Sequence, residues 1–174
     1  MTTRMLLPDM TPPAEEHRSA RFTFSDGAQR LLHWSDREVP YPDGRLIVSR
    51  TNLDGIITHA NDAFVELSGY TRDELIGAPH HILRHPDMPR AAFKDLWSTL
   101  QEGRKWHGYV KNLRKDGAHY WVYATALPNI RDGKVVGYSS VRRKPSRKRI
   151  EDLLPVYRQW LQQEQQQREP EVLA

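Results

Sequence analysis

Three turn signals constrain the fold of this chain more than any other feature of its sequence. Residues 52–55, 115–117 and 131–134 each separate two runs rich in β-branched and aromatic residues, and each contains Asp-Gly. Asp-Gly between alternating runs is a strong signal for a β-hairpin. The turns therefore predict two strands, then a helical segment, then three strands. Helices segregated to one face of an antiparallel sheet make an α+β domain, which is the fold class we expect.

The segment between the second and third strands predicts three helices. Asn61 or Asp62 is placed to cap the first, which Gly69 ends. Thr71 and Glu74 have the spacing of a capping box for the second. The third begins at Pro89, and its apolar residues recur at helical spacing. These residues are Phe93, Leu96, Trp97 and Leu100.

The N-terminal residues 1–37 are expected to form an extension that is partly disordered. Residues 1–21 are rich in Pro, Thr and Glu and lack apolar periodicity, which is typical of a loose tail. Ser25 and Asp26 are placed to cap a short helix, and Leu31, Leu32 and Trp34 would share one of its faces.

Residues 146–174 are expected to form a C-terminal amphipathic helix with a polar tail. Ser146 is a suitable N-cap, and Pro155 should kink the helix or begin a new one. A stripe of this size needs a partner, either the sheet or a second subunit. The stripe consists of Ile150, Leu153, Leu154, Tyr157, Trp160 and Leu161.

Composition excludes several classes of protein. A chain of 174 residues suggests one domain with appendages, here residues 38–145. It has no cysteine, which excludes disulfides, thiolate metal sites and cysteine nucleophiles. No apolar run approaches the length of about 18 residues that spans a bilayer, and no secretory signal is present. A cytoplasmic location is expected.

A stiff polar corner at residues 80–89 gives the clearest functional signal. Its two prolines fix their own φ and keep the residues before them out of the helical region. The corner presents Arg84, His85 and Asp87 in set directions, which suits a polar or anionic ligand. The alternative is an ordinary stiff turn that caps the following helix.

The third predicted strand points to the same region of the fold. Trp106, Gly108, Val110 and Asn112 share one of its faces. If that face meets the helices, Gly108 leaves space, Trp106 offers a flat wall and Asn112 places an amide inside. A buried amide must be hydrogen-bonded, and its donor and acceptor suit a heterocycle. The alternative is that Asn112 binds backbone at the end of the strand.

Several motifs within residues 38–145 occur together in one known family. They are residues 57–64 (Ile-Thr-His-Ala-Asn-Asp-Ala-Phe), 68–71 (Ser-Gly-Tyr-Thr), 84–89 (Arg-His-Pro-Asp-Met-Pro), 110–112 (Val-Lys-Asn), 119–122 (His-Tyr-Trp-Val) and 137–138 (Gly-Tyr). The third of these is much more restricted than the others. On these residues the segment resembles a PAS domain, most closely the sensor domain of bacterial aerotaxis receptors.

The resemblance implies a PAS fold, with a five-stranded antiparallel sheet, helices on one face and FAD held noncovalently between them. It also implies a flavoprotein that senses redox state or respiratory electron flow in chemotaxis signal transduction, and not an enzyme. The signal would pass to a protein partner or to a second subunit of a homodimer. The sheet face, the N-terminal segment and the C-terminal helix are the candidate contact surfaces.

The resemblance also assigns roles to residues of the corner. Arg84 and His85 are expected to bind negative or acceptor groups of FAD. Asp87 is expected to hold Arg84 in place or to accept from a donor on the cofactor. Trp97 and Trp106 offer surfaces for the ring systems.

The remaining cofactor-binding candidates lie on the strands and at a helix start. Asn112 is expected to pair with the pyrimidine edge of the isoalloxazine. Asn61 and Tyr120 are further candidates, although Asn61 could merely cap its helix and Tyr120 could be ordinary core. Val122 stands where flavin photoreceptors carry a second Asn, and without cysteine their photochemistry is excluded.

Other functions have weaker support. His80, His81 and His85 invite a haem or metal site but lack regular ligand spacing, so no metal ligand is predicted. Residues 142–149 are strongly basic, but no groove-reading motif supports binding to nucleic acid, so the run is interpreted as a solvated junction between the last strand and the C-terminal helix. His85 and Asp87 could form a catalytic pair, but no other catalytic motif accompanies them. A PAS module that binds another small ligand or no cofactor is the remaining alternative.

Overall fold

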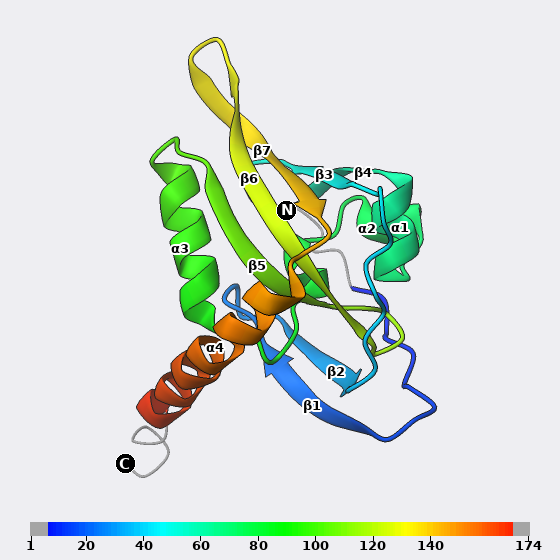
Figure 1. Cartoon of the computed structure of the whole chain (residues 1–174). Helices are drawn as coiled ribbons and strands as arrows, with labels where there is room; N and C mark the ends of the chain where they lie inside the picture. The colour runs from blue at the N-terminus through cyan, green and yellow to red at the C-terminus, as the bar shows by residue number, and fades with distance from the viewer. Residues whose placement is uncertain (1–6, 169–174) are drawn as a thin grey trace.

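A five-stranded antiparallel sheet forms the centre of the computed structural model, which describes residues 7–168 (Figure 1). The spatial order of its strands is β4-β3-β7-β6-β5. This arrangement confirms the predicted sheet, although the β6–β7 hairpin extends further than the sequence indicated. The strands are β3 (Ile47–Thr51), β4 (Ile57–Ala60), β5 (Trp106–Leu113), β6 (His119–Arg131) and β7 (Lys134–Arg143).

The helices between β4 and β5 begin and end at the predicted signals. Asn61 Oδ1 accepts a hydrogen bond from Phe64 N at 3.1 Å, and Gly69 ends α1 with a φ of 76°. Thr71 and Glu74 form the full capping box of α2. The bounds are α1 (Asp62–Ser68), α2 (Arg72–Leu75), the 3-10 helix η1 (His80–Leu83) and α3 (Arg90–Gln101).

The main hydrophobic core lies between the sheet and these helices. The sheet contributes Ile47 and Val122, and the helical segment contributes Phe64, Leu75 and Leu83, all of them almost fully buried. Burial of apolar surface on this scale is the main force that holds helices to a sheet. The core thus fixes the distance between the sheet and the polar corner.

The prediction of a short N-terminal helix around residues 25–34 is wrong. This region is a β-hairpin of β1 (His17–Thr23) and β2 (Gln29–Ser35), which form a separate two-stranded sheet. Asp26 Oδ1 accepts from Ala28 N at 2.9 Å, so Asp26 stabilises a turn instead of a helix start. Arg30 and Leu32 are buried while Leu31 is exposed, which is the alternation of a strand.

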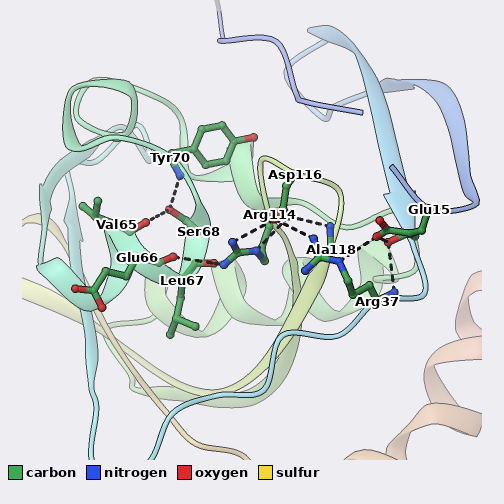
Figure 2. A network of polar contacts seen from close by, with 11 residues as sticks. Glu15, Arg37, Val65, Glu66, Leu67, Ser68, Tyr70, Arg114, Asp116 and Ala118 are labelled. Atoms are coloured by element: carbon green, nitrogen blue, oxygen red, sulfur yellow. Dashed lines mark hydrogen bonds and ion pairs between the residues drawn. The ribbon is translucent and has the colours of Figure 1, made fainter. Parts of the chain in front are cut away.

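A network of charged side chains fastens this extension to the PAS-like core (Figure 2). Arg37 bonds Glu15 Oε1 and Asp116 Oδ2, both at 3.0 Å. Asp116 also accepts from Arg114 Nε. Arg114 Nη1 donates to the carbonyl of Leu67 at the end of α1. Each exposed ion pair contributes little stability alone. Together they fix the N-terminal segment, the β5–β6 turn and α1 relative to one another.

The C-terminal helix α4 (Arg147–Arg168) packs on its own domain, where Tyr157 Oη donates to the carbonyl of Tyr109 in edge strand β5, and its far end extends away from the sheet (Figure 1). Ile150 and Tyr157 of the predicted stripe are buried in the core, whereas Trp160 is 36% exposed. The helix continues without a break through Pro155 and past Leu161, so Pro155 does not begin a new helix. The division at residues 37 and 145 stays a prediction.

No helix within residues 7–168 combines the length and apolar character needed to cross a bilayer.

Candidate functional site

The polar corner lies directly against strand β5. Arg84 and Asn112 form an isolated backbone bridge, and Lys111 N donates to Met88 Sδ at 3.4 Å. Within the corner, Arg84 Nη2 donates to the carbonyl of Met88 at 2.9 Å and closes the loop on itself. The structure therefore brings together the corner and the strand residue that sequence analysis selected independently. The corner opens with a turn of 3-10 helix at residues 80–83, which the sequence did not indicate.

Arg84 is held between aromatic rings from two different elements. Its guanidinium carbon lies 4.2 Å from the ring centroid of Phe93 in α3 and 5.6 Å from that of Phe22 in β1. Such cation–π contacts orient a guanidinium without neutralising its charge. The N-terminal hairpin therefore takes part in shaping the corner.

His85 is a fully buried, neutral imidazole. Its Nδ1 accepts a hydrogen bond from Asp87 N at 3.0 Å, which places the ring proton on Nε2. Burial and the nearby Lys111 lower the pKa of His85 to about 3. Nε2 finds no hydrogen-bond acceptor among the described residues. His85 thus supplies a buried donor beside the corner.

Asp87 is predicted to hold Arg84 in place or to accept from a donor on the cofactor, and in the structure it contacts a lysine of β5. Its carboxylate accepts from Lys111 Nζ at 2.9 Å, and half of the side chain is exposed. Although burial works in the opposite direction, His85 and Lys111 lower the pKa of Asp87. The pair ties the corner to β5, which is a positioning role.

Asn112 and Tyr120 form a buried polar pair on neighbouring strands. The two residues are directly opposite in the β5–β6 register, and both are buried. Asn112 Nδ2 and Tyr120 Oη each lack a hydrogen bond of good geometry among residues 7–168, although Asn112 lies close enough to lower the pKa of Tyr120. Burial dominates and raises that pKa to about 12, so the phenol keeps its proton.

A buried arginine that the sequence analysis missed completes this cluster. Arg142 of β7 is 2% exposed, and its charge interacts with Tyr120. Its Nη2 donates to Ser49 Oγ, and its guanidinium carbon lies 4.5 Å from the ring centroid of Phe64. Nε and Nη1 have no hydrogen-bond partner, and no carboxylate within residues 7–168 forms an ion pair with Arg142. Burial lowers its pKa to about 10, so it remains charged.

His80 extends the cluster toward the 3-10 helix. Its Nε2 lies 3.4 Å from Ser49 Oγ, the same hydroxyl that Arg142 contacts. Burial and then the charge of Arg142 lower the pKa of His80 to about 3. A neutral His80 adds a polar atom to the cluster without adding a second positive charge.

The cluster has the character of a site for an acceptor-rich or anionic ligand. Buried polar atoms are nearly always hydrogen-bonded, and an exception in a native fold calls for a ligand, water or ion. Asn112, Tyr120 and Arg142 all offer unused N–H or O–H donors within one interior region. Carbonyl oxygens and ring nitrogens of a flavin's pyrimidine edge accept such bonds. The residues present therefore fit the cofactor that the sequence resemblance implies.

The other predicted cofactor residues do not all join this cluster. Trp106 donates from Nε1 to Asp95 Oδ2 at 2.8 Å, and its indole fills the space over Gly108 that was expected to be open. Trp97 lies edge-on to Tyr138, with their ring centroids 5.4 Å apart. A ligand that reaches β5 at Gly108 must displace the Trp106 ring.

Asn61 has the structural role that was kept as its alternative. Besides capping α1, it accepts from Val48 N at 3.1 Å and donates to Leu46 O at 2.8 Å. These bonds occupy both ends of its amide and join α1 to β3. Nothing in this geometry directs Asn61 toward the buried cluster.

The histidines of the corner have separate partners. His80 contacts Ser49, His85 accepts from Asp87 N, and His81 pairs with Asp26 while stacking on Phe24 at 4.0 Å between centroids. Among residues 7–168, no three acidic or histidine side chains are grouped as metal ligands.

Arg142 was missed because it opens the basic run 142–149, which the sequence analysis interpreted as a solvated junction. In the structure β7 continues through this position, and Arg142 pairs with Ala124 and Ile47, both of which are buried. Extending the predicted strand by one residue would have placed Arg142 on the inner face. Strand alternation was therefore the signal that could have identified it.

The buried histidines predict a loss of stability in acid. The pKa of a histidine in the unfolded chain is about 6.5, whereas the pKa values of His80 and His85 in the folded protein are about 3. From pH 6.5 downward the unfolded state binds more protons, so the free energy of unfolding falls by up to about 1.4 kcal/mol per pH unit for each group. Urea unfolding at pH 7 and pH 5 measures this. We expect a smaller fall in His80→Gln, and equal wild-type stability at both values would contradict the assignment.

Comparison with known proteins supports the fold and shows which sensor proteins the chain is similar to. Residues 57–142 match the model of the PAS fold. The chain is 49% identical to the aerotaxis receptor of Escherichia coli over 124 residues, which is 71% of this chain and 24% of that protein. It is 38% identical to the biofilm dispersion protein BdlA of Pseudomonas aeruginosa over 93 residues, 50% of this chain and 22% of that protein. The chain thus spans about a quarter of the length of these relatives.

Solved structures show the same fold. The light state of the Aureochrome1 LOV photoreceptor superposes with a TM-score of 0.58 at 23% identity, covering 63% of this chain and 88% of that one. A light-oxygen-voltage domain studied with a flavin analogue gives a TM-score of 0.56 at 26% identity, covering 63% of this chain and 83% of that one.

Proposed function

This chain belongs to the PAS family, and on that premise we propose that it is a sensor module that binds FAD noncovalently between its sheet and helices. The observation that carries the proposal is the buried cluster of unused donors at Asn112, Tyr120 and Arg142. The similarity to an aerotaxis receptor and to a light-oxygen-voltage domain studied with a flavin analogue supports a flavin as the ligand.

The residues of the site would divide the binding of such a cofactor between them. Arg142 and Asn112 would donate to acceptors on the pyrimidine edge, and Tyr120 would add a neutral donor. Arg84 and His85 would contact negative or acceptor groups outside the cluster. When bound, a flavin supplies a reversible electron acceptor whose charge and hydrogen bonding change on reduction. Arg142 is then the charged group placed to respond to that change.

The proposed role is to report redox state or respiratory electron flow to a protein partner or a downstream domain. The similarity to the aerotaxis receptor supports this role, and we propose a cytoplasmic location. The site contains donors that bind and orient, and we assign no catalytic residue. The half-buried outer face of the sheet and the exposed part of α4 remain the candidate contact surfaces for a partner or second subunit.

Arg84→Ala tests the contribution of the corner. We expect a folded protein whose affinity for FAD is reduced about ten- to a hundredfold, the range for losing a hydrogen bond to a charged group. Fluorescence titration of flavin-free protein with FAD measures the effect, and titrations with FMN and riboflavin identify which part of FAD the corner binds. Arg50→Ala, an exposed arginine of β3, is the matched control. Unchanged FAD affinity in Arg84→Ala would remove the corner from the site.

A further inference from the structure

The first turn of α3 is capped by a carboxylate from a different helix. Glu164 of α4 accepts from Arg90 N through Oε2 at 3.1 Å and from Ala91 N through Oε1 at 3.0 Å. The residue at the N-cap position is Pro89, which provides no side-chain hydrogen bond. The first N–H groups of a helix have no partner inside the helix, and a negative charge is favourable there. Glu164, 73 residues beyond Ala91 in the chain, accepts hydrogen bonds from these N–H groups and supplies the negative charge.

This contact holds the outer half of α4, which is the part of the helix after Tyr157. The inner half is fixed by burial of Ile150 and Tyr157 and by a hydrogen bond from Tyr157 Oη to Tyr109 O at 2.8 Å. After Tyr157 the helix is mostly exposed, with Trp160 partly in solvent and glutamines following it. Glu164 is half-buried and supplies the polar contact of this outer half with α3.

The capped turn is also the end of the polar corner. Met88 and Pro89 lead directly into α3, and the Arg84 guanidinium binds the carbonyl of Met88 and the ring of Phe93 in the first turn of the helix. The corner, the start of α3 and the outer half of α4 are therefore one connected unit. A shift of the corner moves the two N–H groups that Glu164 binds.

We infer that Glu164 is a positioning residue that couples occupancy of the corner to the docking of α4. A ligand that fixes the corner fixes the first turn of α3 and favours docked α4, and docked α4 in turn favours the ligand. Coupling of this kind is reciprocal, so each event changes the equilibrium of the other by the same factor. The cap itself stands on the geometry alone, while its coupling to FAD rests on the proposed function.

Amide hydrogen exchange of the full chain without flavin tests the cap. In Glu164→Ala we expect the amides of Arg90 and Ala91 and those of the outer half of α4 to exchange roughly 3- to 30-fold faster, the range expected for loss of a helix cap. Glu164→Gln keeps one acceptor oxygen and should give a smaller increase. Glu151→Gln, an exposed residue of the inner half of α4, should leave these rates unchanged. Wild-type exchange rates in Glu164→Ala would overturn the inference.

Titration with FAD then tests the coupling. We expect Glu164→Ala to weaken FAD binding, and FAD to slow exchange in the outer half of wild-type α4 by the same factor. Equal FAD affinity in both proteins, with unchanged exchange in α4, would overturn the coupling. If neither protein binds FAD while the capped amides exchange faster in Glu164→Ala, the cap is supported and the proposed function is wrong.

Discussion

Arg142→Met is expected to abolish FAD retention while leaving the protein folded and at least as stable as the wild type. The arginine is buried with no carboxylate partner in the described chain, and two of its nitrogens lack hydrogen bonds. Replacing a buried charge by an apolar side chain of similar volume is often neutral or stabilising, by about 1–4 kcal/mol. A buried charge without a carboxylate partner is explained by a ligand that would neutralise it.

The expected loss of FAD affinity in Arg142→Met is at least about a hundredfold, because a charge-assisted hydrogen bond in the interior is removed. Urea unfolding of the flavin-free protein and FAD titration measure the two effects separately. Arg143→Met is the matched control, since the adjacent side chain is exposed. Retained FAD together with lower stability would show that Arg142 has a purely structural role.

Asn112→Leu is expected to have the second largest effect. The substitution removes the buried Nδ2 donor while keeping the volume and shape of the side chain. Because that donor lacks a good partner among the described residues, its loss should cost little stability. FAD affinity should fall about ten- to a hundredfold, since the pyrimidine edge loses its amide partner.

Asn129→Leu is the control for this substitution. Asn129 is a half-buried amide near the tip of the β6–β7 hairpin, where its Oδ1 accepts from Ser139 Oγ at 2.7 Å. FAD affinity should be unaffected there. If Asn112→Leu binds FAD as tightly as the wild type, Asn112 is a strand-end residue and takes no part in the site.

Features that depend on local sequence could be predicted from it. The Asp-Gly turns located the hairpins of the main sheet, and the capping box at Thr71 and Glu74 located α2. Strand alternation grouped Asn112 with Trp106 and Val110 on one face of the strand, and all three side chains are buried. Each of these signals lies within a few residues of the element that it specifies.

Features that depend on distant contacts could not be predicted in this way. Leu31, Leu32 and Trp34 fit one face of a helix as well as they fit a strand, and pairing with β1 decides between them. Arg142 becomes an interior residue only because β3 and β6 flank it on both sides. The cap from Glu164 joins residues far apart in the chain and leaves no local signature.

The visible absorption spectrum of freshly purified protein, before and after dithionite, shows whether the protein binds FAD when the released cofactor is identified after denaturation. We expect two broad bands in the near-ultraviolet and blue that bleach on reduction, with FAD released. A single sharp Soret band would contradict this expectation and assign haem to this domain. A colourless protein that FAD cannot reconstitute would contradict it as well, and would leave the buried donors of Asn112, Tyr120 and Arg142 for another ligand.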